Sequence, residues 1–193
     1  NNGTLFSYDR ASGDLNTRAS ESSTFKTVAS FTGSNGAGPN TTLIDAGGTL
    51  YGTTSGGGTT DKGTLFSYDP SSGRLTRLAS LTNGGGLSTA VGGTLYGTIP
   101  QGGKEGNGAL FSYDLSSGRL KTLASFPNGP RFTGGMYPSG LTAFDGKLYG
   151  TTSEGGKAGD GTLFSYDLSN GRLKPRVSFT RSDGESPNGL TAI

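Results

Sequence analysis

The sequence of 193 residues contains neither histidine nor cysteine. It therefore offers no Ser-His-Asp triad, no imidazole metal ligand and no thiolate nucleophile, and it cannot form a disulfide framework. No apolar run approaches the roughly 18 residues that a membrane-spanning helix needs, so we expect neither a membrane span nor a signal peptide among these residues. We predict no catalytic residue, no metal site and no cofactor.

Charge is also scarce and nearly balanced. The chain has 16 Lys and Arg against 14 Asp and Glu, which leaves a net charge of +2. Such a small excess gives no electrostatic footprint for nucleic acid, and we expect no nucleic-acid partner. One enzymatic alternative remains open, a glycosidase or lyase that uses two carboxylates about 5 to 10 Å apart. Its candidate carboxylates are Glu105, Glu154, Asp160 and Glu185.

Glycine, in contrast, is abundant, and one glycine opens a phrase that occurs four times. The phrase Gly-Thr-Leu-Phe-Ser-Tyr-Asp stands at residues 3–9, 63–69, 108–114 (with Ala109 in place of threonine) and 161–167. A fixed phrase separated by variable spacers is typical of a repeat protein, in which each unit buries its apolar faces against its neighbours. The phrase predicts the fold, and the variable spacers are where function must be sought.

One unit reads as four short strands. In the third complete unit these cover residues 139–144, 147–152, 162–167 and 173–179, and the dipeptide Asp145-Gly146 favours a tight hairpin between the first two. In the third strand, Leu163 and Ser165 face one side of the sheet while Phe164 and Tyr166 face the other, so large side chains point both ways, as expected for a sheet between two others. No segment has helical apolar spacing. The pattern predicts an all-β propeller of four-stranded antiparallel blades, with the first strand innermost and Tyr51, Tyr96 and Tyr149 at equivalent places. A β-solenoid is the alternative, although its rungs are usually shorter and more uniform.

The repeat also carries a family resemblance. The motif Leu-Tyr-Gly-Thr at residues 50–53, 95–98 and 148–151, the paired glycines that follow it and the Gly-Thr-Leu-Phe-Ser-Tyr-Asp phrase resemble the GloVer (Gloeo_Verruco) tandem repeat, and the double glycine is more distantly similar to kelch propellers. The resemblance implies a secreted or surface-anchored propeller. It implies no catalytic residues, because the family is recognised by its repeat and not by an activity.

The strand count divides the single repeat domain, residues 1–193, into unequal parts. Complete blades are expected at 40–81, 86–126 and 138–179, a partial blade at 1–31, and the first strand of a further or closing blade at 188–193. The partial blade has an insertion of about ten residues at 14–24. A four-blade ring would lack one strand and leave ladder groups unpaired, so we expect a piece of a propeller with more than four blades.

Candidate binding residues lie in the loops between the second and third strands and between successive blades, because in a meander these loops emerge on one face. The residues we select are Lys104, Glu105, Arg131, Tyr137, Glu154 and Lys157. Variable loops on a rigid scaffold commonly bind ligands, although a single charged loop residue needs no explanation beyond solvation. The repeated Asp9, Asp69, Asp114 and Asp167 are expected to accept hydrogen bonds in turns rather than to bind metal. Tyr8, Tyr68, Tyr113 and Tyr166 are expected to pack between blades with bonded hydroxyls.

From these observations we expect a non-catalytic extracellular or cell-surface module that binds other molecules, with a polysaccharide or surface glycan as the favoured ligand because the loops are neutral and rich in Thr, Ser and Gly. A purely structural role in an extracellular fibre or surface layer, built by self-association through edge strands, is the alternative. Asn2 and Asn40 lie in glycosylation sequons.

Overall fold

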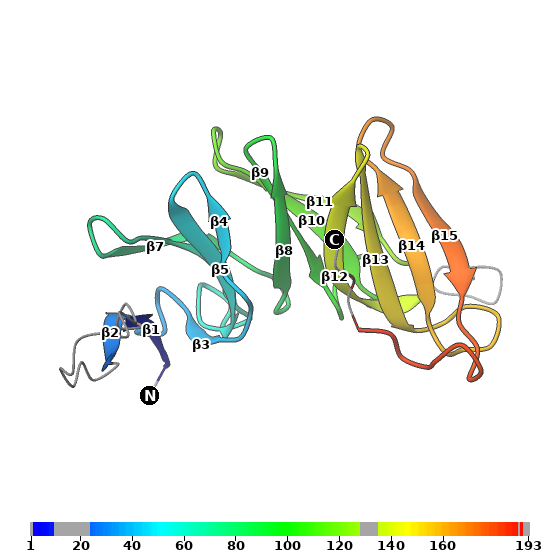
Figure 1. Ribbon diagram of the computed structural model, residues 1–193, viewed down its shortest axis with the longest axis horizontal. Coiled ribbons are helices and arrows are strands. Elements are labelled where there is room, and N and C mark those ends of the chain that lie inside the picture. Colours follow the sequence, from blue (N-terminus) through cyan, green and yellow to red (C-terminus); the bar gives the residue numbers. More distant parts are fainter. Residues whose placement is uncertain (1, 10–23, 128–134, 189, 191–193) are drawn as a thin grey trace, which may run out of the picture.

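The computed structural model describes residues 2–9, 24–127, 135–188 and 190 of the chain. Within these ranges all regular secondary structure is β-strand, and the antiparallel sheets follow one another in chain order (Figure 1). The described residues hold no helix long and apolar enough to cross a membrane. The predicted insertion at 14–24 and the predicted strand at 188–193 lie almost entirely outside the described residues, and Arg131 lies outside them as well.

Four sheets form the blades. Blade 1 contains β1 (Thr4–Asp9) and β2 (Thr24–Ser30). Blade 2 contains β3 (Ala37–Pro39), β4 (Ile44–Ala46), β5 (Thr49–Gly56), β6 (Thr64–Asp69) and β7 (Arg74–Ser80). Blade 3 contains β8 (Gly86–Val91), β9 (Thr94–Ile99), β10 (Ala109–Asp114) and β11 (Arg119–Ser125). Blade 4 contains β12 (Met136–Phe144), β13 (Lys147–Glu154), β14 (Thr162–Asp167) and β15 (Leu173–Ser178).

Blades 2, 3 and 4 are meanders whose first strand lies innermost, and blade 1 is the antiparallel pair β1–β2. In blade 2 the short strands β3 and β4 both pair with β5 and together take the place of the first strand. The first strands of successive blades adjoin, since β8 contacts both β4 and β12. Tyr51, Tyr96 and Tyr149 pair with the serine of the repeated phrase in their respective blades, so they occupy equivalent places as predicted.

The hairpins between first and second strands follow the predicted turn chemistry. Asp145 and Gly146 both have positive φ, 46° and 67°, as a type I′ turn requires. The double glycines of blades 2 and 3 stand at the same point with positive φ. These turns set the register of strands that carry side chains on two buried faces.

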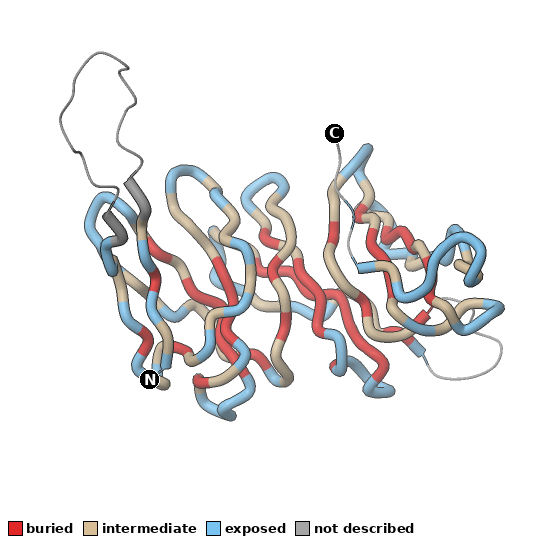
Figure 2. The backbone as a smooth tube through the Cα atoms, turned by 60° about the horizontal axis from the view of Figure 1, so that its bottom comes forward, coloured by how far each residue is buried: buried red, intermediate tan, exposed pale blue. Residues whose placement is uncertain are grey.

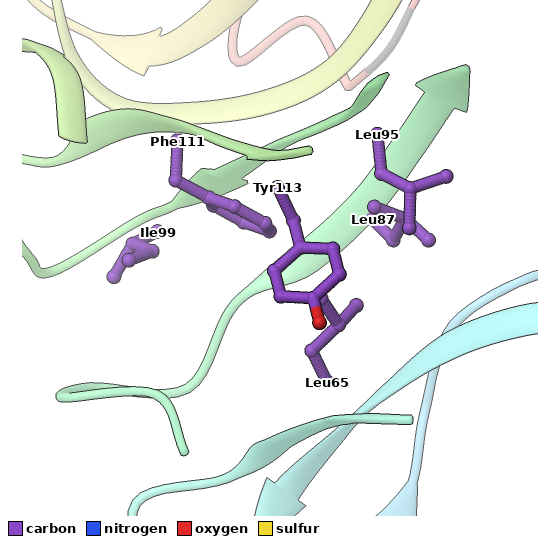
Figure 3. Close-up of a cluster of buried hydrophobic side chains, with 6 residues drawn as sticks. All are labelled: Leu65, Leu87, Leu95, Ile99, Phe111 and Tyr113. Carbon is purple, nitrogen blue, oxygen red and sulfur yellow. The ribbon is translucent and has the colours of Figure 1, made fainter. Parts of the chain in front are cut away.

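The core consists of layers between blades. Leu65 of blade 2 packs against the blade 3 side chains of Leu95, Phe111 and Tyr113 (Figure 3). The arrangement recurs one blade later, where Leu110 packs with Leu148, Phe164 and Tyr166. Buried residues run along the middles of the strands while the turns are exposed (Figure 2). The prediction of a sheet with bulky residues on both faces is therefore confirmed.

The repeated tyrosines and aspartates have structural roles. Tyr68, Tyr113 and Tyr166 are buried between blades, and burial raises the pKa of Tyr113 and of Tyr166. The packing part of the expectation is therefore confirmed for these three tyrosines, and the hydrogen bonds expected for their hydroxyls stay a prediction. Asp69 accepts hydrogen bonds from the backbone N–H and the hydroxyl of Ser71, at 2.8 and 2.7 Å, which confirms the turn role.

These turns predict a defined acid sensitivity. Hydrogen bonds from turn serines, the Ser71 and Ser116 hydroxyls foremost, lower the pKa of Asp69 and of Asp114 from 3.8 to about 2, and the Ser169 hydroxyl lowers that of Asp167. A carboxyl whose folded pKa is depressed stabilises the fold above its unfolded pKa, and this contribution disappears as pH falls from about 4 to about 2. We expect the triple variant Asp69→Asn, Asp114→Asn, Asp167→Asn to show a shallower loss of melting temperature over that range. An unchanged pH profile would contradict the assignment.

Candidate functional site

A repeated joint links each blade to the next. In each blade, one residue stands directly before the first glycine of the repeated phrase. Its backbone carbonyl accepts a hydrogen bond from a backbone N–H at the start of the following blade. The donor–acceptor pairs are Gly38 to Asn2, Gly84 to Lys62, Tyr137 to Asn107 and Ser186 to Asp160, at 2.7 to 3.1 Å. We call this arrangement the interblade joint. It brings the loop after each second strand against the start of the next blade.

Tyr137 occupies this joint in an unusual conformation. Its φ is 56°, and the equivalent Gly38 and Ser186 have φ of 62° and 50°. A left-handed backbone disfavours residues other than glycine. Because the same conformation recurs at three joints, the joint itself imposes it, and blade 4 alone places an aromatic ring there.

A cleft of about 370 Å³ lies at this point. Its lining comes from three blades and consists of Ser55, Asn83, Gly84, Pro100, Gln101 and Tyr137. A second hollow, of about 270 Å³, shares lining residues with the cleft. A third, of about 600 Å³, shares Thr41, Thr98 and Gly140 with the second and continues along the innermost strands. The cleft is therefore the outer end of a continuous concave surface.

The cleft carries hydroxyl, amide and ring groups, and its lining includes no charged side chain. Asn83 donates through Nδ2 to the carbonyl of Gln101, which ties the loop between blades 2 and 3 to the β9–β10 loop. Neutral donors and acceptors beside an aromatic face suit a hydroxyl-rich neutral ligand better than an ion.

Asn107 supplies a buried donor beside the cleft. The backbone carbonyl of Asn107 accepts the Tyr137 N–H at 2.8 Å. Asn107 is only 8% exposed. Among the described residues, its Nδ2 is the one buried side-chain polar atom without a hydrogen-bond partner. Buried polar groups are normally satisfied, and an orphan donor commonly marks a place for water or a ligand group.

The residues selected from the sequence fall in different places. Tyr137 lines the cleft. Lys157 lines a separate groove beside β15, Lys104 and Glu105 are exposed in the β9–β10 loop, and Glu154 is exposed at the end of β13. The structure therefore does not gather the described members of this set into one site.

Sequence reasoning missed the neutral residues of the cleft, which are Ser55, Asn83 and Gln101. The sequence analysis selects mainly charged loop residues, whereas the cleft is lined by amides and a hydroxyl. The usable signal is the position of Asn83 and Gln101 in loops of the predicted face. Within the described residues, no three Asp or Glu side chains are grouped as a metal site would require.

The sequence match decides the family. The family model of the Gloeobacter/Verrucomicrobia repeat matches residues 1–127 and 82–192. The chain belongs to this repeat family. Comparison with curated proteins found no match.

Solved structures show the fold of this Gloeobacter/Verrucomicrobia repeat protein. TolB from Acinetobacter baumannii is 17% identical with a TM-score of 0.51, over 79% of this chain and 34% of TolB. A chain of the nidogen/laminin complex is 15% identical with a TM-score of 0.54, over 86% and 55%. The extracellular domain of BT4673 from B. thetaiotaomicron is 18% identical with a TM-score of 0.51, over 74% and 17%. The repeat protein is a β-propeller module, and it spans less than two thirds of each of these chains.

Proposed function

We propose that this chain belongs to a non-catalytic, extracellular or cell-surface β-propeller that binds carbohydrate in the cleft at Tyr137. The observation that carries the proposal is the meeting of three blades in a neutral cleft with one aromatic ring and two amide side chains. The residue type at this joint supports it: the joint imposes a left-handed backbone that glycine adopts in blade 2, yet blade 4 has a tyrosine there at a conformational cost. The extracellular placement draws support from the similarity to the BT4673 extracellular domain.

The chemistry of each group fits a sugar. The Tyr137 ring offers an apolar face for the C–H face of a pyranose, while Asn83, Gln101 and Ser55 supply neutral groups for its hydroxyls. Asn107 belongs to the same joint through its backbone carbonyl, and its unsatisfied Nδ2 would donate to a water that bridges to the ligand. A neutral site of this kind binds with little dependence on salt.

Substitution of Tyr137 tests the proposal. We screen neutral polysaccharides on a glycan array and measure the affinity of a hit by calorimetry. We expect Tyr137→Gly to weaken binding at least tenfold, in the range typical for loss of an anchoring ring, while Tyr137→Phe retains binding. The glycine variant keeps or gains melting temperature, because glycine removes a left-handed cost of about 1–2 kcal/mol and loses roughly 0.5–1 kcal/mol in chain entropy.

Ser186→Gly is the matched control, because Ser186 has the same backbone conformation at the next joint and does not line the cleft. It should shift stability in the same direction without changing affinity. Equal binding by wild type and Tyr137→Gly would remove the cleft from consideration. Absence of glycan binding together with concentration-dependent assembly would favour the structural role, and new reducing ends from incubated polysaccharide would restore the glycosidase alternative.

A further inference from the structure

A pair of hydroxyl side chains joins the first and second strands in blades 2 and 4. In blade 4, Ser139 Oγ lies 3.2 Å from Thr151 Oγ1, and the two residues are register partners in β12 and β13. In blade 2, Thr41 Oγ1 lies 3.2 Å from Thr53 Oγ1. The threonine of each pair also donates a hydrogen bond to a backbone carbonyl beyond its own blade, at 3.1 Å from Thr151 and 2.6 Å from Thr53. Both residues of each pair therefore have partners within the protein.

Blade 3 keeps the threonine of this pair but has no hydroxyl opposite it. Thr98 is the threonine of the Leu-Tyr-Gly-Thr motif in blade 3, and its register partner in β8 is Gly86, which has no side chain. Thr98 is 3% exposed, and its hydroxyl has no hydrogen-bond partner among the residues that the structure describes. Among those residues, Asn107 Nδ2 is the one fully enclosed side-chain polar atom without a partner. The Thr98 oxygen is therefore not fully enclosed, and it reaches the hollow that Thr98 lines.

The backbone does not require glycine at residue 86. Gly86 does not have positive φ, and an added Cβ would have one neighbour within 4 Å beyond the adjoining residues, the Thr41 methyl at 3.8 Å. Glycine in a strand usually marks a bulge or the close approach of another backbone or of a ligand. The bulge of β8 lies between Leu87 and Thr89, and no other backbone approaches the Cβ position. Of these explanations, the approach of a ligand remains.

Gly86 and Thr98 line the hollow of about 270 Å³ that adjoins the cleft at Tyr137. The hollow and the cleft share Gly84 and Pro100 in their linings. Blades 2, 3 and 4 all contribute to the hollow, and its lining has hydroxyl, amide and proline groups but no charged side chain. At roughly 30 Å³ per water molecule the hollow has space for about nine waters, which is enough for one pyranose ring with its hydroxyls.

We propose that this hollow is a second sugar subsite, in which a sugar hydroxyl takes the place of the side chain that Gly86 lacks and pairs with the Thr98 hydroxyl. A hydroxyl can both donate and accept, so a sugar can supply what Ser139 supplies opposite Thr151. An anionic group would find no cation in the lining. This subsite rests on the function proposed for the cleft and extends it: the ligand is a neutral saccharide chain with adjacent sugars in the cleft and the hollow.

Gly86→Ser tests the subsite, because it gives blade 3 the residue that blade 4 has and places a hydroxyl of the protein opposite Thr98. The probes are linear oligosaccharides of one to six sugars from the α-1,4-glucan, β-1,4-glucan, β-1,4-mannan and β-1,4-xylan series, and calorimetry measures their affinities. We expect wild type to bind six sugars at least tenfold more tightly than one sugar. Gly86→Ser should lose most of this gain. Its melting temperature should be equal or higher, since serine loses less chain entropy than glycine on folding.

Thr98→Val removes the other half of the contact and serves if Gly86→Ser does not fold. It should weaken binding of the six-sugar probe at least fivefold and leave the affinity for one sugar within twofold. Its melting temperature should not fall, because the Thr98 hydroxyl has no partner among the described residues. Thr53→Val should be less stable than wild type, because Thr53 donates to the buried carbonyl of Gly85.

Gly56→Ser is the matched control for the added hydroxyl. Gly56 also lies in a strand, β5, without positive φ, and an added Cβ would have no atom closer than 3.7 Å. It lines neither the cleft nor the hollow. Affinities of this variant should remain within twofold of wild type. Equal losses in Gly56→Ser and Gly86→Ser would overturn the subsite.

The remaining outcomes separate the subsite from the cleft. Binding that is lost in Tyr137→Gly but unchanged in both Gly86→Ser and Thr98→Val would overturn the subsite and leave the function proposed for the cleft intact. Equal affinity for one sugar and for six would do the same. Absence of binding by every series would overturn both proposals.

Discussion

Thr54→Ile alone should lower the free energy of unfolding by about 2–3 kcal/mol, whereas Thr54→Ile combined with Thr64→Ala should lower it by only about 1 kcal/mol. The two side chains are fully buried, and their hydroxyl oxygens lie 2.9 Å apart. Thr54 Oγ1 also accepts the Thr64 N–H at 3.0 Å and donates to the carbonyl of Gly56 at 2.8 Å. An isoleucine here removes these bonds and crowds the remaining hydroxyl.

The reason for the recovery lies in the next blade. Blade 4 repeats the threonine pair as Thr152 and Thr162, also 2.9 Å apart, but blade 3 has Ile99 opposite Ala109 at the same place. Both residues of blade 3 are buried. Replacing both partners of a buried hydrogen-bonded pair by apolar groups of matching shape costs little, while removing one leaves a buried polar group unsatisfied. The same buried position is therefore filled by a hydrogen-bonded threonine pair in blades 2 and 4 and by an apolar isoleucine–alanine pair in blade 3.

Urea unfolding of the two single variants and the double variant gives the coupling energy as a double-mutant cycle. We expect Thr64→Ala alone to cost about 1 kcal/mol, since Asn35 then loses the donor to its carbonyl. The reciprocal cycle in blade 3, Ile99→Thr with Ala109→Thr, is the control and should couple with the same sign. Additive losses in both cycles would show that the pairs are not interchangeable.

The fold was predictable because local signals agree with the global arrangement. The repeated phrase marks the third strand of each blade, and the Asp145-Gly146 and Gly-Gly dipeptides mark hairpins. Apolar side chains on both faces of a strand indicate a sheet that packs between two other sheets. All of these act over a few residues, so a single sequence displays them. The bulge in each outer strand was not predicted, since its extra residue has no fixed type: it is Val28, Leu78 and Leu123 in the first three blades and Arg176 in blade 4.

The candidate sites were predicted less well, for a physical reason. A site forms where loops from different blades meet, and the sequence does not show which of many loop residues point inward. The face was chosen from topology, and Tyr137 lies in its cleft, but the other lining residues are neutral and were passed over.

Gly63→Ala should lower the free energy of unfolding by more than about 3 kcal/mol, which exceeds the cost of an ordinary left-handed substitution. Gly63 opens the repeated phrase with φ of 106°, and a Cβ there would overlap the carbonyl oxygen of Thr54. The backbone has no freedom to withdraw. Gly63 donates to the carbonyl of Gly57 at 3.2 Å and accepts from Leu81 at 2.9 Å.

Gly92→Ala is the matched control because Gly92 also has positive φ, 56°, but no heavy atom within 4 Å of an added Cβ. Its cost should be confined to the left-handed backbone penalty of about 1–2 kcal/mol. Thermal and urea unfolding of both variants measure the difference, which isolates the crowding between Gly63 and the Thr54 carbonyl. Equal losses of stability in Gly63→Ala and Gly92→Ala would mean that the backbone at Gly63 shifts to accommodate a methyl group. A larger loss at Gly63 would mean that close approach of two backbones, and not turn geometry alone, requires the glycine that begins each repeat. The equivalent Gly161 meets the same crowding from the carbonyl of Thr152, while Gly108 meets the ring of Pro138 and, less closely, the carbonyl of Pro100.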